Sequence, residues 1–441
     1  MGQITEHGIA ADVISLLAQS GALTRRMISR LLDRVDDASL SQSIRRLTDR
    51  GYVVMIRRGK HQYLCLSDEG WRFAERIGAI YMPCIRNLSL ENVYDQSRLV
   101  RSGIGVFTAH ELGLKCLPAE KMHLGAFAQE LGALIEIDAK CEDKSNYCPA
   151  ARKATQQLNE LIKQGVYYTI DELNAAFLAS NKDAIGFNRS SVIGVAFMEH
   201  RIALCMLVTN KRQIVVPFSE SRFTDALENI FGGCYQFAPR ELSLRKIDFE
   251  VWLFASGDYL LPTVFHGVAD GIVNQGKKEQ PYQVEPQSRK PERLSANYLA
   301  SIGAAYWIPL AERDRARRQS FLTDKKQSEA ETIARLREKL KTDAPIIVCN
   351  NPDLCQLKQY YNDENVKSIY VIGREDPMWV DLISRCLRKK LAGYFVDTAD
   401  QAQVSYTRYS ATGRPLIGNT NRIDYDAPLR PNSARRNRAK S

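Results

Sequence analysis

The first 80 residues contain closely spaced signals that begin and end helices, and this spacing constrains the fold more than any other feature. Apolar residues recur at helical spacing near Ala10–Gln19, and Gly21 ends that run. Thr24 is placed to cap a second helix, and Asp36-Asp37 interrupts the chain before a third. Gly51 follows the third helix, where a left-handed glycine typically ends a helix. Three short helices are therefore expected before residue 51.

Two short β-like runs follow these helices, at Tyr52–Ile56 and Gln62–Leu66. Between them lies the basic turn Arg57-Arg58-Gly59-Lys60-His61, which has a glycine at its tip. The segment Ser67-Asp68-Glu69-Gly70 then has the form of a helix start. The expected order is helix, helix, helix, strand, strand, helix.

This order resembles the winged helix-turn-helix of bacterial DNA-binding proteins. The resemblance rests on Leu23-Thr24 at the second helix, Arg50-Gly51-Tyr52 after the third, the basic turn, and Leu66-Ser67-Asp68-Glu69-Gly70 before the last helix. It implies that residues 1–82 form a DNA-binding domain. The third helix would then enter the major groove, while the basic hairpin, or wing, contacts phosphates or the minor groove.

The third helix offers two different faces. Leu40, Ile44 and Leu47 recur at i, i+4 and i+7 and should point inward. Gln42 and Arg45 then point outward and suit the edges of adenine and guanine. The candidate DNA contacts in the helix and the wing are Ser41, Gln42, Arg45, Arg46, Arg50, Arg57, Arg58, Lys60 and His61. In the alternative interpretation these arginines are only a solvated face, and the module binds protein.

The central region is expected to be an α+β domain. Residues 90–112 are expected to be helical, with Val93 and Phe107 among the apolar residues, and a β-hairpin is expected at Val192–Met198 and Ile202–Val208. The segments Tyr168–Leu173 and Asn188–Val195 resemble the replication-relaxation family of bacterial plasmids and integrative elements. That resemblance implies DNA binding in replication, mobilisation or their regulation, and it brings no catalytic residue with it.

Central regions of this kind can be related to restriction-endonuclease-like folds, whose PD-(D/E)xK sites hold a divalent metal. Asp183 with Glu199-His200-Arg201 has Arg where such a site needs Lys, and it falls in a hairpin turn. Asp138-Ala139-Lys140, with Glu136 one pleat earlier, lacks a convincing upstream acid. A degenerate, non-catalytic domain is the favoured interpretation, and a metal-dependent nuclease is the alternative.

Other enzyme classes lack their signatures. The chain has no Gly-x-x-x-x-Gly-Lys-Ser/Thr loop for nucleotide phosphates and no Gly-x-Ser-x-Gly elbow. The pairs Tyr167-Tyr168 and Tyr360-Tyr361 lack the histidine cluster with which a relaxase holds its metal, and they are interpreted as packing residues. The 10 cysteines include no Cys-x-x-Cys pair. The expectation is a protein that is not an enzyme and that uses no cofactor and no metal.

Residues 311–343 are dense in charge and are expected to form a helical connector. Ile333, Leu336 and Leu340 give it a narrow apolar stripe. A solvated linking helix is the favoured interpretation, and self-association or a protein partner is the alternative. Strand and helix patterns then alternate over residues 344–410 and predict a small parallel α/β layer. Residues 411–441 are expected to be a basic, disordered tail.

The composition, with 44% hydrophobic and 25% charged residues and a net charge of +10, is that of a globular chain. No apolar run predicts a transmembrane helix, and the N-terminus lacks a signal-peptide pattern, so no membrane association and a cytoplasmic location are expected. The expected fold is multidomain α+β, with domains at residues 1–82, 83–310, 311–343, 344–410 and 411–441. The expected function is binding of double-stranded DNA in replication, mobilisation or transcriptional control of a mobile element.

Overall fold

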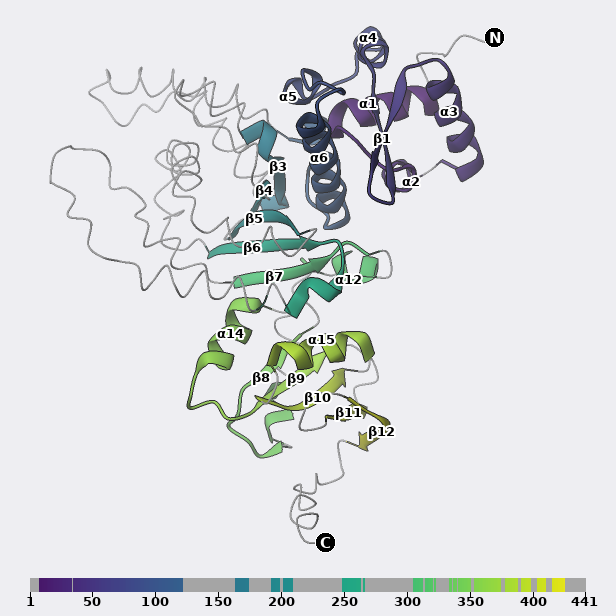
Figure 1. Cartoon of the computed structure of the whole chain (residues 1–441). Helices are drawn as coiled ribbons and strands as arrows, with labels where there is room; N and C mark the ends of the chain where they lie inside the picture. Colours follow the sequence, from purple (N-terminus) through teal and green to yellow (C-terminus); the bar gives the residue numbers. More distant parts are fainter. Residues whose placement is uncertain are drawn as a thin grey trace, which may run out of the picture. The chain divides into compact units, whose positions relative to one another are not determined.

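The computed structural model shows a mixed α+β chain with several sheets (Figure 1). None of the helices in the described part of the chain combines the length and the apolar character that crossing a bilayer requires. The structure describes residues 8–33, 35–121, 163–173, 192–198, 201–208, 248–262, 265, 304–311, 314–319, 321–322, 333–334, 336–338, 340–349, 353–373, 377–387, 390–397, 403–409 and 415–424.

The chain forms two compact units. Unit 1 comprises residues 1–207, 216–252 and 279–303, and unit 2 comprises residues 208–215, 253–278 and 304–441. The domain boundary expected at residue 82 therefore falls inside unit 1. The packing explains this, because the helix α6 (Val93–Glu111) lies against α1 (Ile9–Ser20) and α2 (Arg25–Leu31).

The N-terminal elements follow the order expected from the sequence. After α1 and α2 come α3 (Asp37–Asp49), the strands β1 (Val53–Arg58) and β2 (His61–Leu66), and the helices α4 (Asp68–Arg76) and α5 (Pro83–Arg86). The strands pair antiparallel from Val53 opposite Leu66 to Arg58 opposite His61. Helix α1 packs against both α3 and α4, and α3 also packs against β1.

Local side-chain chemistry explains where these elements begin and end. Thr24 caps α2 by accepting a hydrogen bond from the Met27 amide at 3.3 Å. Ser67 caps α4 in the same way through the Gly70 amide at 3.0 Å. Gly51 has φ +74° directly after α3, which is the left-handed conformation expected there. Asp36 does more than interrupt the chain, because it caps α3.

The core beneath these helices is apolar. Leu40 and Leu47 of α3 are fully buried, whereas Ile44, which was expected to point inward with them, is only half-buried. Val93 was expected on the apolar face of the long helix, but 58% of it is exposed. The reason is that burial of α6 begins only at Leu99, more than a turn beyond its first residue.

A five-stranded sheet has the hydrogen-bonded order β3-β4-β5-β6-β7. Its strands are β3 (Val166–Thr169), β4 (Val192–Met198), β5 (Arg201–Val208), β6 (Asp248–Ala255) and β7 (Ala304–Pro309). The expected hairpin is present as the antiparallel pair β4 and β5. The nuclease candidates Glu136, Asp138, Lys140, Asp183, Glu199 and His200 lie outside the described residues.

A second five-stranded sheet has the order β12-β11-β10-β9-β8. The strands β8 (Ile346–Val348), β9 (Ile369–Gly373) and β10 (Leu391–Asp397) are parallel to one another, as expected for an α/β layer. The helices α14 (Leu354–Asn362) and α15 (Pro377–Leu387) alternate with them along the chain. The strands β11 (Gln403–Tyr409) and β12 (Pro415–Asp424) extend the sheet in the antiparallel direction.

The expectation of a disordered tail from residue 411 was wrong for residues 415–424, which form β12. The hydrogen bonds from β12 satisfy backbone groups of β11 that would otherwise lie along an open sheet edge. The polar side chains of residues 411–441 had suggested disorder. The hydrogen bonds that pair two strands are made by the backbone, however, so polar side chains do not prevent a strand. Residues 425–441 lie outside the described residues.

The expectation of one helical connector over residues 311–343 was also wrong. The helix α12 (Arg315–Gln319) is short, and the chain bends at Phe321 and Leu322. The apolar stripe has a partner within unit 2, because Leu336 is buried against the sheet residues Ile346, Ile372 and Phe395, with Ile333 and Leu340 packed against the same cluster. The stripe is therefore part of a core of unit 2.

Candidate nucleic-acid interface

The outer face of α3 carries the polar residues selected from the sequence. Gln42, Arg45 and Arg46 are exposed, and Arg50 is exposed at the end of the helix. They are held by the opposite face, where Leu40 and Leu47 have no exposed surface. A helix anchored in this way presents one amide and three guanidinium groups, which are the groups that pair with base edges and phosphates.

The beginning of α3 has the opposite charge. Asp36 accepts hydrogen bonds from the amides of Ala38 at 3.1 Å and Ser39 at 2.8 Å. A hydrogen bond from the Ser39 side chain, followed by those from the backbone amides, lowers the pKa of Asp36 below its ordinary value. Asp37, the first residue of the helix, is also exposed. An anionic ligand is therefore favoured at the middle and the end of α3 and disfavoured at its start.

Two of the predicted residues on α3 already have partners. The Ser41 hydroxyl donates to the carbonyl oxygen of Asp37, so this donor is used inside the helix. The Arg45 guanidinium lies 3.8 Å from the Asp49 carboxylate, and both side chains are exposed. An exposed pair of this kind contributes little free energy, so Arg45 can exchange Asp49 for another acceptor.

The β1–β2 hairpin brings the other predicted residues together. Its two-residue turn is Gly59-Lys60, and Gly59 has φ +58°, as a glycine at the first position of a type II′ turn requires. Arg57, Lys60 and His61 are exposed around this turn. Arg58 differs from them, because it is half-buried and its Nη2 donates to the carbonyl oxygen of Val93 in α6.

Two further exposed arginines of α2 were not among the residues selected from the sequence, and one of them, Arg25, lies beside α3. Arg25 and Arg26 are exposed in the first turn of α2. The Nη2 of Arg25 donates to the Asp37 carbonyl oxygen at 3.3 Å, which places this guanidinium at the start of α3. The sequence feature that could have identified them is the pair of adjacent arginines directly after the Thr24 cap.

Helix α6 is held closely against the helices that carry this surface. A Cβ on Gly103 would lie 1.9 Å from the carbonyl oxygen of Ala22, so only glycine permits this approach. At the end of α6, the Glu111 carboxylate accepts from Arg30 of α2 at 2.9 Å, and the Glu111 side chain is only 3% exposed. The position of α2 is thus tied to α6 by a close backbone approach and a largely buried ion pair.

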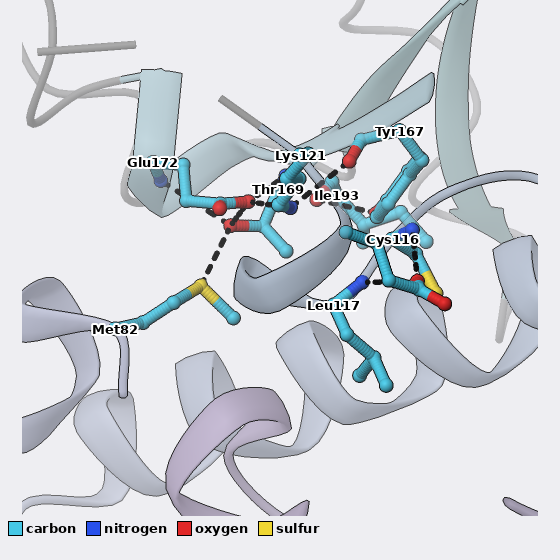
Figure 2. A network of polar contacts seen from close by, with 9 residues as sticks. Met82, Cys116, Leu117, Lys121, Tyr167, Thr169, Glu172 and Ile193 are labelled. Atoms are coloured by element: carbon cyan, nitrogen blue, oxygen red, sulfur yellow. Dashed lines mark hydrogen bonds and ion pairs between the residues drawn. The ribbon is translucent and has the colours of Figure 1, made fainter. Parts of the chain in front are cut away.

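A polar network lies at the beginning of the short helical segment that follows β3 (Figure 2). Thr169 and Glu172 bond reciprocally, because the Glu172 carboxylate accepts from the Thr169 amide at 2.8 Å and the Thr169 hydroxyl accepts from the Glu172 amide at 3.2 Å. The Lys121 ammonium lies 2.7 Å from Glu172, and its Nζ also donates to the Tyr167 carbonyl oxygen at 3.0 Å. The Lys121 side chain is 2% exposed, so this is a structural ion pair.

A second ion pair joins α6 to the same segment. The Arg98 guanidinium donates from Nε at 3.1 Å and from Nη2 at 2.8 Å to one oxygen of Asp171. Burial raises the pKa of Asp171 above its ordinary value, and the Arg98 charge opposes that rise. Both networks involve the Tyr168–Leu173 segment, on which the resemblance described above partly rests. Their contacts cap a helix or pack one element against another.

The buried tyrosines of β3 are packing residues, as predicted. Tyr167 has no exposed surface, and its hydroxyl donates to the Ile193 carbonyl oxygen at 3.0 Å. Burial raises its pKa well above the ordinary value, which opposes use as a nucleophile. Burial likewise raises the pKa of the Cys65 and Cys116 thiols to about 12.

The described residues contain no group of three or more His, Cys, Asp or Glu side chains that could hold a metal ion. Among the sequence-predicted contacts, the structure brings Gln42, Arg45, Arg46 and Arg50 together on α3, with Arg57, Lys60 and His61 around the hairpin turn. Comparisons of the chain with protein-family models, with curated proteins and with solved structures find no match. The exposed polar face of α3 and the adjoining basic hairpin are the two features of these residues that could contact a nucleic acid.

Proposed function

We propose that residues 9–76 form a winged helix that binds double-stranded DNA. In this proposal α3 enters the major groove, where Gln42 and Arg45 contact base edges. Arg46 and Arg50 contact phosphates, and the β1–β2 hairpin serves as the wing, with Arg57, Lys60 and His61 near the backbone or the minor groove.

One observation carries this proposal above the others. The polar face of α3 is exposed while Leu40 and Leu47 on its apolar face are fully buried in the core, so the helix is anchored and its outer side chains are accessible. The basic hairpin packs beside it. Its Gly59-Lys60 turn brings Arg57, Lys60 and His61 together.

The charge distribution supports a particular orientation on the duplex. Asp36 and Asp37 disfavour phosphates at the start of α3, and Arg45, Arg46 and Arg50 favour them further along. The duplex would therefore be contacted mainly through the middle and the end of α3. Arg25 in the first turn of α2 lies at the start of α3, so it would offset part of the negative charge there.

We further propose that the protein is not an enzyme and acts on a plasmid or integrative element, in replication, mobilisation or transcriptional control. This part rests on the resemblance of the Tyr168–Leu173 and Asn188–Val195 segments to the replication-relaxation family. Incubation of supercoiled and single-stranded DNA with the protein and Mg²⁺ or Mn²⁺ tests the first point. Metal-dependent cutting that Asp138→Asn or Glu199→Gln abolishes would favour the nuclease alternative.

DNA recovered with the purified protein and then sequenced gives the test of binding. A duplex carrying the recovered sequence should bind, and the logarithm of its binding constant should fall linearly with the logarithm of salt concentration. Changing Arg57 and Lys60 together to Ala should reduce that slope by about 1.8, because each phosphate contact contributes about 0.9. Arg72→Ala removes an exposed cation from α4 and serves as the matched control. An unchanged slope in the Arg57 and Lys60 variant would remove the hairpin from the interface.

A second candidate is a winged helix that binds protein. The large apolar side chains Met55, Ile80, Val93 and Tyr94 are between 53% and 70% exposed in this part of the chain. A contiguous patch of such side chains would be typical of a docking surface. This function predicts that no duplex is retarded, and that changing Met55 and Tyr94 to Ser removes binding of a protein partner recovered with the chain.

A further inference from the structure

Arg58 occupies a different environment from the other cations of the hairpin. It is the last residue of β1 and pairs across the hairpin with His61. Successive residues of a strand point to opposite sides, so Arg57 and Arg58 face in different directions. Arg57 is exposed, whereas Arg58 is half-buried.

The guanidinium of Arg58 is committed to α6. Its Nη2 donates to the carbonyl oxygen of Val93, the first residue of that helix and 35 positions further along the chain. Its Nε is buried and has no hydrogen-bond partner among the described residues. The Arg58 guanidinium therefore has a partner on α6, whereas the side chains of Arg57 and Lys60 are exposed.

Helix α6 provides a fixed base for this contact. Arg98, five residues after Val93, is paired with the buried Asp171. A Cβ on Gly105 would lie 2.2 Å from the Tyr167 hydroxyl, so α6 also lies directly on β3. At its other end, Glu111 is paired with Arg30 of α2. The hairpin end is thus connected to the same helix that positions α2.

We propose that Arg58 is a positioning residue, which docks the end of the hairpin on α6 and so sets the direction of the wing relative to α3. The consequence for DNA rests on the proposed DNA-binding function. Arg58 then contributes to affinity by orienting Arg57 and Lys60, and it makes no phosphate contact of its own. The sequence alone placed Arg58 among the DNA contacts, because a basic hairpin gives no sign of which cation faces inward.

The test compares the neighbours Arg58→Ala and Arg57→Ala in the full chain. Without DNA, Arg58→Ala should accelerate amide hydrogen exchange in residues 53–66 about fivefold, the factor expected from one lost hydrogen bond. Arg57→Ala should leave that exchange unchanged. Equal exchange in both variants would overturn the docking role, and circular dichroism checks that both variants keep their helices.

Salt dependence separates positioning from direct contact. Arg58→Ala should weaken binding of the recovered duplex without changing the salt slope, whereas Arg57→Ala should reduce the slope by about 0.9. A reduction of about 0.9 in Arg58→Ala would show that Arg58 binds a phosphate and would overturn the proposal. If the unaltered chain bound no duplex, the proposed function would fail, and the exchange rates would still decide whether Arg58 docks the hairpin.

Discussion

Single residues of the candidate interface differ in whether their hydrogen-bond donors already have a partner within the protein. Gln42, Arg46 and Arg57 are exposed. The Ser41 hydroxyl is used by the Asp37 carbonyl oxygen, and the guanidinium of Arg58 is used by α6. Residue type therefore identified the candidate DNA contacts. Their exposure and their existing hydrogen-bond partners indicate which of them are more accessible to a ligand.

Substitutions at Gln42 and Arg45 should affect sequence recognition more than general affinity. Gln42→Ala and Arg45→Ala are each expected to cost about 1–3 kcal/mol on the cognate duplex and less on random DNA, because bidentate contacts to bases are lost. Fluorescence anisotropy with both duplexes measures the difference, and Arg72→Ala is the control. Equal losses on the two duplexes would mean that these side chains contact only the backbone.

The cap of α3 should make stability depend on acid pH. The pKa of Asp36 is lowered in the folded chain, so its ionised form stabilises α3. This contribution is complete above the ordinary pKa of 3.8 and is lost as the pH falls through the lowered value. Asp36→Asn keeps a capping oxygen but cannot ionise.

Urea unfolding followed by circular dichroism, repeated from about pH 6 to about pH 3, tests this sign. The unaltered chain should lose more unfolding free energy over this range than Asp36→Asn does. Parallel pH profiles for the two proteins would show that ionisation of Asp36 does not contribute to the cap.

At the scale of elements, the main feature of α6 is its close approach to neighbouring elements at two glycines. Two glycines separated by one residue serve different contacts, since Gly103 adjoins the Ala22 backbone and Gly105 adjoins Tyr167 of β3. One helix thereby contacts both the elements around α3 and the β3–β4 pair. Its position, more than the hairpin alone, determines how the candidate interface is held.

Gly103→Ala should be destabilising although alanine is the better helix former. The added Cβ would lie 1.9 Å from the Ala22 carbonyl oxygen, and backbone cannot move aside as a flexible side chain can. A loss of about 1–3 kcal/mol is expected from such overpacking, against a gain of about 1 kcal/mol from helix propensity alone. Chemical unfolding measures it, with exposed His110→Ala on the same helix as the control. A net stabilisation would show that α6 does not approach Ala22 this closely.

At the scale of the whole molecule, unit 1 and unit 2 are each assembled from distant segments of the chain. Within unit 1, buried charges connect α6 to residues far away in sequence, as in the pair between Arg98 and Asp171. Asp171 is 3% exposed, so removing its cation leaves a carboxylate in a poorly solvated position. In unit 2, the apolar stripe at Leu336 is covered by strands that come later in the chain.

Arg98→Leu should therefore destabilise the packing of α6 on β3 by about 3–5 kcal/mol, as expected when one partner of a buried pair is removed. The double variant Arg98→Leu with Asp171→Leu should recover a large part of that loss, because the buried Asp171 carboxylate is removed together with its cation. Amide hydrogen exchange of α6 and β3 reports on both variants. A double variant as unstable as the single one would indicate that shape, not charge, dominates at this contact.

The boundaries of many elements could be predicted from the sequence because they depend on neighbouring residues. Thr24 and Ser67 cap helices, Gly51 ends one, and Gly59 turns the hairpin, each through contacts within a few positions. The hydrophobic pattern likewise predicted the β4–β5 hairpin and the parallel strands β8, β9 and β10. The exposed arc of α3 follows from the same short-range spacing.

Tertiary structure alone decided which of these features face one another. Arg58 meets Val93, Arg30 meets Glu111 and Arg98 meets Asp171 across separations of 35, 81 and 73 residues. The Leu336 stripe is buried and β12 joins a sheet for the same reason, because their partners lie in other elements. Local propensity carries no information about such distant partners, so the sequence determined the elements and the candidate contacts, whereas packing determined which contacts stay accessible.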